Sequence, residues 1–187
     1  MDLHSSKSYP FKGLAAPGSN YYIVGFMGSG KTHWGRIWAQ QNHLFFTDLD
    51  EVIERNTGST IAKIFDYKGE DYFRKIEAEA LRSCSYLQNT IVACGGGTPC
   101  FHENMQWMND QGNTIYLACT TDEIIERVMA EQDKRPLLKK LNPGELLFFI
   151  EQKLKEREVF YSQAKIKMQS GGLTANSFND IMSSFNK

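Results

Sequence analysis

The chain has 187 residues, of which 41% are hydrophobic and 23% charged, and its formal net charge is −1. Such a composition is that of one globular domain, long enough for a sheet covered on both faces. The near-neutral charge argues against nucleic acid or an anionic membrane as partner, and no apolar run approaches the roughly 20 residues that a membrane-spanning helix needs.

The N-terminus and the cysteines carry no targeting or metal signal. Residues 1–20 lack the basic start and apolar middle of a signal peptide, and we expect them to form a flexible polar extension. The four cysteines have no paired spacing and no histidine at ligand distance, which favours free thiols in a cytoplasmic protein. Residues 21–187 are then expected to form a single domain.

Short apolar runs alternate with longer segments of helical periodicity along this domain, which is typical of a parallel sheet with helical crossovers. We expect strands at residues 21–25, 44–48, 90–94, 113–118 and 164–168. We expect helices at residues 31–41, 50–56, 60–66, 70–87, 121–131, 144–161 and 176–185.

Two segments interrupt the alternation. The insertion at about residues 49–88 is longer than one crossover needs. The segment at about residues 131–142 is basic and apolar without clean periodicity. We expect the first segment to form an acceptor-binding insertion and the second to form a lid.

Residues 25–32 read Gly-Phe-Met-Gly-Ser-Gly-Lys-Thr after an apolar run, which is the G-x-x-x-x-G-K-[ST] phosphate-binding loop in its strand-to-helix context. The backbone N–H groups of Gly28, Ser29 and Gly30 are expected to surround phosphate oxygens. Lys31 supplies a charge for the β and γ phosphates, and the Thr32 hydroxyl is placed to bind Mg²⁺. The sequence therefore predicts a nucleoside triphosphate site.

Asp48 and Asp50 follow the second predicted strand. Strand alternation would point both side chains to the carboxyl edge of the sheet, where one could join the Mg²⁺ shell and the other meet an acceptor hydroxyl. The alternative is a solvated helix start, because acidic residues favour a helix N-terminus.

Four further segments carry candidate substrate residues. Arg74 lies three residues before Glu77, either as a surface ion pair or as a guanidinium fixed to grip a carboxylate. The glycines at 95–97 permit close backbone approach to a ligand. Arg135 in the predicted lid could close over the phosphates, and Arg157 is either a second carboxylate ligand or part of a charged helix face.

The combination of these motifs, in this order and spacing from about residue 21 to 168, resembles shikimate kinase. The resemblance implies a P-loop kinase fold, an α/β three-layer sandwich with a five-stranded parallel sheet in the order 2-3-1-4-5. It implies transfer of the γ-phosphate of ATP to the 3-hydroxyl of shikimate, with Mg²⁺ as cofactor. It also implies a cytoplasmic monomer with no nucleic-acid or membrane partner.

The resemblance assigns roles to the candidate residues. The catalytic residues are Lys31, Asp50 and Arg135. The ATP-binding residues are Gly28, Ser29, Gly30, Lys31, Thr32, His33 and Arg127, and the Mg²⁺ ligands are Thr32 and Asp48. The shikimate-binding residues are Asp50, Arg74, Gly95, Gly96, Gly97, Arg135 and Arg157, with Arg74 and Arg157 on the substrate carboxylate.

The chain departs from the family pattern at two places near the expected nucleotide. His33 stands where most members carry a second hydroxyl residue against the α-phosphate. Residues 170–176 contain no arginine, although members often carry one against the base. Arg127 is a candidate to stack on adenine.

Two alternatives remain. A gluconate or nucleoside monophosphate kinase would share the fold but would not need the aspartate pair, the Phe-Arg-x-x-Glu segment and the triple glycine together. A non-catalytic nucleotide-binding module would be expected to lose Lys31, Asp48 or Asp50, and all three are present.

Overall fold

Five parallel strands form the centre of the computed structural model, which describes residues 19–130 and 142–185. The strands are β1 (Asn20–Val24), β2 (Phe45–Asp48), β3 (Thr90–Ala93), β4 (Gly112–Ala118) and β5 (Ile166–Gln169). Their order in the sheet is β2-β3-β1-β4-β5, which confirms the predicted topology. In the central strand, Tyr22 pairs with Val92 of β3 and with Thr114 of β4.

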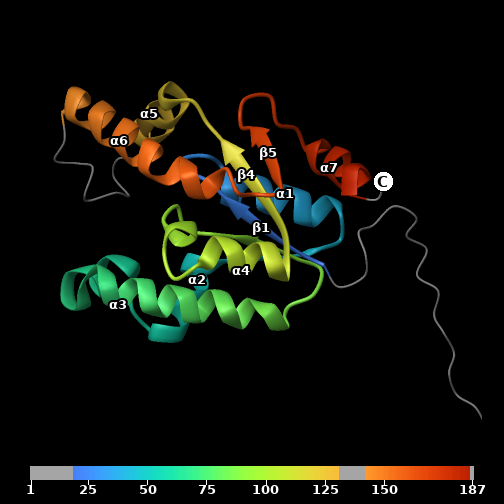
Figure 1. Cartoon of the computed structure of the whole chain (residues 1–187), viewed down its shortest axis with the longest axis horizontal. Coiled ribbons are helices and arrows are strands. Elements are labelled where there is room, and N and C mark those ends of the chain that lie inside the picture. The colour runs from blue at the N-terminus through green and yellow to red at the C-terminus, as the bar shows by residue number, and fades with distance from the viewer. Residues whose placement is uncertain (1–18, 131–141, 186–187) are drawn as a thin grey trace, which may run out of the picture.

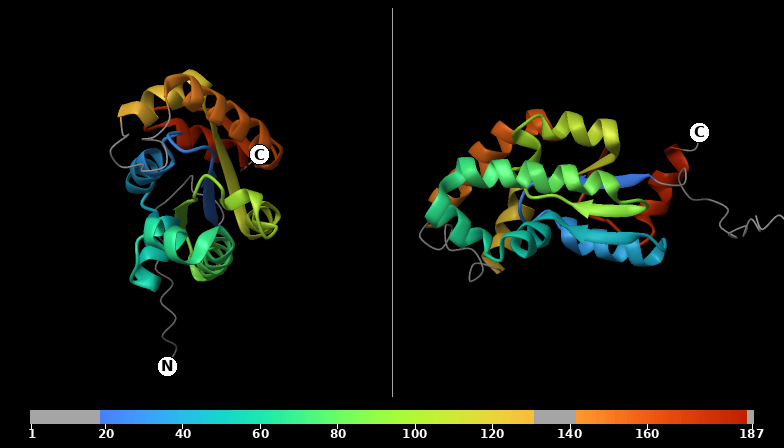
Figure 2. Two further views of the ribbon diagram at one scale, coloured as in Figure 1. Left: turned by 90° about the vertical axis from the view of Figure 1, so that its left-hand side faces the viewer. Right: turned by 90° about the horizontal axis from the view of Figure 1, so that it is seen from below.

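Helices cover both faces of the sheet (Figure 1). They are α1 (Lys31–Gln41), α2 (Leu49–Thr57), α3 (Ile61–Ser83), α4 (Asn104–Gln111), α5 (Thr121–Ala130), α6 (Pro143–Tyr161) and α7 (Ser177–Phe185), with 3₁₀ turns at Cys84–Tyr86 and Thr98–Cys100. The right-hand view of Figure 2 shows α3, in green, and α1, in blue, on opposite sides of the strands.

Two separate cores result from the alternation of side chains along the strands. Tyr21 and Ile23 of β1 pack with buried residues of α1 and α7. Tyr22 and Val24 face the opposite way and pack with residues of the helices α2 to α6. The central strand β1 is thus apolar on both faces, as a parallel strand between two helix layers must be, and the three-layer α/β architecture is confirmed.

The insertion after β2 divides as predicted. The expected helices at 60–66 and 70–87 correspond to the two helical parts of α3, which meet at a kink at Gly69, where φ is 79° and ψ is 175°. The second part ends at Ser83 and continues as a 3₁₀ turn. Helix α4 is an additional element that the sequence analysis did not predict.

Local capping explains two helix starts near the site. The Asp48 side chain accepts a hydrogen bond from the backbone N–H of Asp50 and so caps α2. Asn142 and Glu145 form a reciprocal capping box at the start of α6. Within the described residues, no helix is long and apolar enough to cross a membrane.

Candidate active site

The loop between β1 and α1 has the backbone shape that its glycines predict. The φ angles of Gly25, Gly28 and Gly30 are 145°, 78° and 88°, values that residues with side chains rarely adopt. A Cβ atom on Gly25 would lie 2.6 Å from the carbonyl oxygen of Leu117. The loop leads directly into the N-terminus of α1, where N–H groups and the helix dipole favour a bound phosphate.

Lys31 and Ser29 contribute to this loop in different ways. The Lys31 Nζ donates to the carbonyl oxygens of Gly25, at 2.9 Å, and Phe26, at 2.8 Å, so the ammonium lies over the loop. Ser29 is fully buried, and its N–H donates to the carbonyl of Phe26 at 3.1 Å. The backbone of Ser29 therefore closes a turn of the loop, and the residue does not line the cavity above it.

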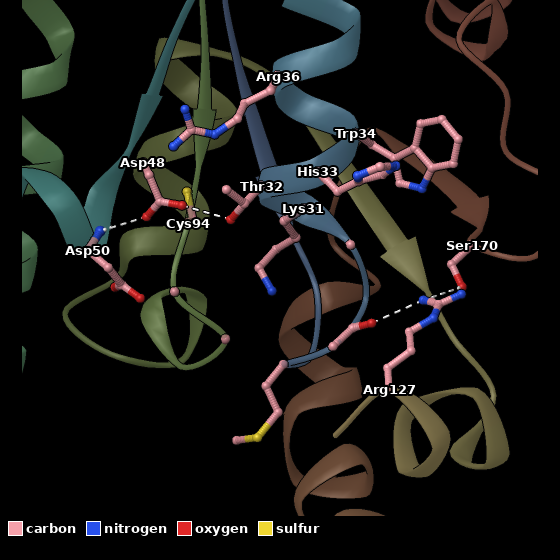
Figure 3. A pocket seen from close by; sticks show the side chains of 15 residues that line it. Lys31, Thr32, His33, Trp34, Arg36, Asp48, Asp50, Cys94, Arg127 and Ser170 are labelled. Carbon is pink, nitrogen blue, oxygen red and sulfur yellow. Dashed lines mark hydrogen bonds between the residues drawn. The ribbon is translucent and has the colours of Figure 1, made fainter. Parts of the chain in front are cut away.

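A cavity of about 790 Å³ opens over the loop and the start of α1 (Figure 3). The residues of the predicted ATP and Mg²⁺ sites that line it are Gly28, Gly30, Lys31, Thr32, His33, Asp48 and Arg127. Trp34, Cys94 and Ser170 also line it, and the sequence analysis did not single them out as site residues.

Thr32 and Asp48 lie together at the edge of this cavity. The Thr32 hydroxyl donates to Asp48 Oδ2 at 2.7 Å, while Asp48 Oδ1 accepts the N–H of Asp50 at 3.0 Å. The cap on α2 therefore fixes the carboxylate that faces Thr32. A hydroxyl and a carboxylate oxygen are hard ligands of the kind that Mg²⁺ prefers.

Asp50 lines the cavity as expected, but its backbone belongs to a helix and not to the predicted strand end. β2 ends at Asp48, and Asp50 lies in the first turn of α2, so strand alternation does not orient it, and the helix-start alternative describes its backbone. Its side chain nevertheless lines the cavity. Burial, followed by the negative charges of Asp48 and Glu77, raises the pKa of Asp50 to about 6, although Lys31 opposes the shift.

A second cavity of about 650 Å³ adjoins the first. It is lined by Arg74, Arg157 and the three glycines at 95–97. Met27, Asp50, Gly95 and Gly96 line both cavities. Asp50 is thus the one carboxylate, among the described residues, that lines both the phosphate-loop cavity and the arginine-lined cavity.

The Arg74 guanidinium is held on several sides. Glu70 Oε1 accepts from Nε at 3.1 Å and from Nη2 at 2.9 Å, and Glu77 Oε2 accepts from Nη1 at 2.8 Å. Phe101 lies under the guanidinium, with its ring centroid 4.3 Å away. The surface ion-pair alternative does not apply, because Arg74 is 8% exposed and Glu77 1% exposed.

The triple-glycine segment meets Arg74 closely. A Cβ on Gly97 would lie 2.6 Å from Arg74 Nη2, so a side chain there would displace the guanidinium. The next residue, Thr98, is buried and donates from its hydroxyl to Glu77 Oε1 at 2.6 Å. Thr98, Glu77 and Arg74 therefore form a buried chain of contacts that orients the guanidinium.

Arg157 of α6 approaches the same glycines from another side. A Cβ on Gly96 would lie 3.4 Å from Arg157 Nη1, and the guanidinium lies over the Phe26 ring at 5.4 Å. The Tyr161 hydroxyl, one helical turn later, donates to the carbonyl oxygen of Gly96. Arg157 is therefore turned into the arginine-lined cavity, and the alternative of an exposed helix face is not what the structure shows.

The remaining predicted residues are placed as follows. Arg127 Nη1 donates to the carbonyl oxygen of Gly28 at 3.0 Å and to Ser170 Oγ at 3.4 Å, and these contacts tie α5 to the loop (Figure 3). The His33 ring lies edge-on to Trp34 with centroids 5.0 Å apart. Arg135 lies outside the described residues.

Comparisons with known proteins agree with this geometry. A family model described as "Shikimate kinase" matches residues 27–186. A curated shikimate kinase of Phocaeicola vulgatus is 39% identical over 144 residues, which cover 77% of this chain and 82% of that one. The chain belongs to the shikimate kinase family.

Two solved structures extend the similarity to the whole fold. The crystal structure of a shikimate kinase from Bacteroides thetaiotaomicron has a TM-score of 0.83 at 31% identity and covers 90% of this chain and 98% of that one. A shikimate kinase from Acinetobacter baumannii in complex with shikimate has a TM-score of 0.79 at 29% identity, with 90% and 92% covered. The family and fold expected from the motifs are confirmed, and the gluconate and nucleoside monophosphate alternatives are not favoured.

Proposed function

We propose that the protein is a shikimate kinase that transfers the γ-phosphate of ATP to the 3-hydroxyl of shikimate and releases ADP. The observation that carries this proposal is the shared wall of the two cavities. A phosphate-loop cavity and a cavity with two arginines meet at Asp50, Gly95 and Gly96. A phosphate donor in one and a carboxylate-bearing alcohol in the other would bring the γ-phosphorus and the acceptor oxygen together at this wall, with ADP leaving from the donor side.

The acceptor side is suited to a ring acid. Arg74 and Arg157 supply two guanidinium groups for a carboxylate, and charge-assisted pairs of this kind give both affinity and orientation. The backbone at 95–97 lets the ring approach closely. Asp50 receives the 3-hydroxyl from the boundary of the cavities and orients it, or accepts its proton, as the phosphoryl group arrives.

The donor side neutralises the transferring charge. Lys31 lies over the phosphate loop, and the N–H groups of Gly28 and Gly30 add partial positive charge for the phosphates. Thr32 and Asp48 fit Mg²⁺, which when bound would neutralise phosphate charge. The role of Arg135 in closing over the phosphates stays a prediction from the sequence. The same holds for the contact of His33 with the α-phosphate and for that of Arg127 with the base.

The activity is tested by measuring ADP release with purified protein, MgATP and one acceptor at a time. We expect turnover with shikimate and background rates with gluconate and with nucleoside monophosphates. Turnover with another acceptor and none with shikimate would overturn the assignment while leaving the phosphate-loop site intact. The family also supports action as a cytoplasmic monomer, and sedimentation of the active protein tests the oligomeric state.

Thr98 gives a prediction specific to the acceptor side. Thr98→Val keeps the volume but removes the donor to Glu77, so that the Arg74 guanidinium is less firmly oriented. We expect the KM for shikimate to rise several-fold, up to about 10-fold, with the KM for ATP unchanged. Thr98→Ser should restore the wild-type value, and steady-state kinetics with each substrate varied in turn would check it. An equal rise in both KM values would contradict the positioning role.

A further inference from the structure

The first turn of α1 presents two different sides. Figure 3 shows Thr32 pointing toward Asp48, whereas His33 and Trp34 point to the other side of the helix, the side on which Ser170 and Arg127 lie. All of these residues line the phosphate-loop cavity. Because Thr32 and Asp48 mark the reacting end of the bound triphosphate, the nucleoside end has to leave the loop on the side of His33 and Trp34.

Trp34 is held rigidly on this side. Its ring stacks on Trp38, with centroids 5.9 Å apart and an interplanar angle of 25°. Trp38 is fully buried, donates from Nε1 to the carbonyl of Thr174 at 3.0 Å, and stacks on Phe178. The inner rings therefore anchor the outer indole, and little conformational entropy remains to be lost when a ligand contacts it.

The indole also lies against the phosphate loop itself. A Cβ on Gly30 would be 3.1 Å from Trp34 Cδ1 and 3.4 Å from its Nε1. A tryptophan that served only the core would be buried as Trp38 is, but Trp34 is only half-buried and borders a cavity that is otherwise lined largely by polar groups and glycines. An aromatic surface beside a polyphosphate cradle suits the planar base of a nucleotide, because any base can stack on it.

We propose that Trp34 contacts the nucleobase of ATP and forms the aromatic wall of the base site. This inference rests on the proposed function, since it describes the nucleoside end of the same ATP site. The segment 170–176 has no arginine that could contact the base. Trp34 would supply a base contact instead. Arg127 Nη1 donates to Ser170 Oγ at 3.4 Å, and these two residues would then lie on the other side of the base from Trp34.

The test compares a ligand that has a base with one that lacks it. Calorimetry would measure the Kd of MgADP and of magnesium tripolyphosphate for the wild type, for Trp34→Leu and for the matched control Trp107→Leu. Trp107 packs on Tyr22 and Arg82, away from the cavity. We expect Trp34→Leu to weaken MgADP roughly 5- to 150-fold, while tripolyphosphate binding changes less than twofold. Trp107→Leu should change neither.

Two outcomes of this comparison would overturn the proposal. An unchanged Kd for MgADP in Trp34→Leu shows that the base does not contact the indole. An equal loss of MgADP and tripolyphosphate shows that Trp34 acts through the shape of the phosphate loop. Neither ligand needs an acceptor, so a protein that behaves as expected here but does not phosphorylate shikimate would refute the proposed function alone.

A fluorescence measurement on protein that retains Trp34 tests the proposal if Trp34→Leu does not fold. In Trp107→Leu protein the tryptophan fluorescence, excited at a wavelength that tyrosine does not absorb, comes from Trp34 and Trp38 alone. We expect MgADP to change the emission of this protein, and tripolyphosphate to change it much less. Equal responses to the two ligands, or no response to MgADP, would overturn the proposal.

Discussion

Replacing Asp50 with asparagine is expected to lower kcat for shikimate phosphorylation by about 100-fold or more, the usual contribution of a positioned acid–base group. The substitution would keep the size of the side chain and remove the negative charge at the wall between the two cavities. Steady-state kinetics would check the loss, with Asp71→Asn, at an exposed position of α3, as the matched control. A kcat within twofold of the wild type would remove Asp50 from the reaction.

The same substitution is expected to stabilise the ligand-free protein. Because burial and neighbouring acids raise the pKa of Asp50 from 3.8 to about 6, the folded protein binds the proton more tightly than the unfolded chain does. The ionised carboxylate therefore lowers the free energy of unfolding above about pH 6, by about 3 kcal/mol at most, and has no such effect below about pH 4.

Thermal unfolding in metal-free buffer would measure this effect. The Tm of Asp50→Asn should exceed that of the wild type by a few degrees at pH 7, and the two values should converge near pH 4. A difference in Tm that is the same at both pH values would show that the charge of Asp50 is not its cause. A residue that costs stability while it serves the reaction would explain why a carboxylate is kept in this unfavourable place.

Replacing Arg74 with alanine is expected to raise the KM for shikimate roughly 10- to 150-fold, because charge-assisted hydrogen bonds contribute about 1.5–3 kcal/mol each. The KM for ATP should change much less, since Arg74 does not line the phosphate-loop cavity. Kinetics with each substrate varied in turn would separate the two effects. A normal KM for shikimate would refute the carboxylate assignment.

Because Arg74 pairs with the buried Glu77, the experiment needs two further variants. Alanine leaves the Glu77 carboxylate buried without this cation, which destabilises the fold. Arg74→Lys retains the positive charge but not the fork that contacts Glu70 and Glu77 together, so it should still raise the KM for shikimate with a smaller loss of Tm. Arg55→Ala, at an exposed position of α2, should change neither quantity.

The phosphate loop was predictable from the sequence because its chemistry is local. The spacing of Gly25, Gly28 and Gly30 determines a backbone path within eight consecutive residues, and Lys31 and Thr32 follow it directly. The sheet order followed from the resemblance that the motifs carry. Helix α4 was missed because it is short, and two residues with left-handed backbone, His102 and Glu103, precede it without a glycine to mark the turn.

The contacts that orient the Arg74 guanidinium were not predictable in the same way. Glu77 and Thr98 are 21 residues apart in the chain, and nothing in the spacing indicates that a threonine after the triple glycine reaches a carboxylate on α3. Glu70 had a local signal, since it lies four residues before Arg74 in a helix that was predicted to start at residue 70. Asp50 lines both cavities, but its orientation comes from a capped helix and not from the predicted strand, and its role stays a prediction.

The wall common to the two cavities has a consequence for inhibition. Among the described residues, Met27, Asp50, Gly95 and Gly96 line both the phosphate-loop cavity and the arginine-lined cavity. One molecule with a diphosphate at one end and a ring carboxylate at the other would span both without rearrangement of the sheet, and tethering the second group raises its effective concentration. Such a two-headed compound would engage the arginine pair and the glycine cradle at once, a combination that distinguishes this enzyme from phosphate-loop proteins that lack the acceptor space.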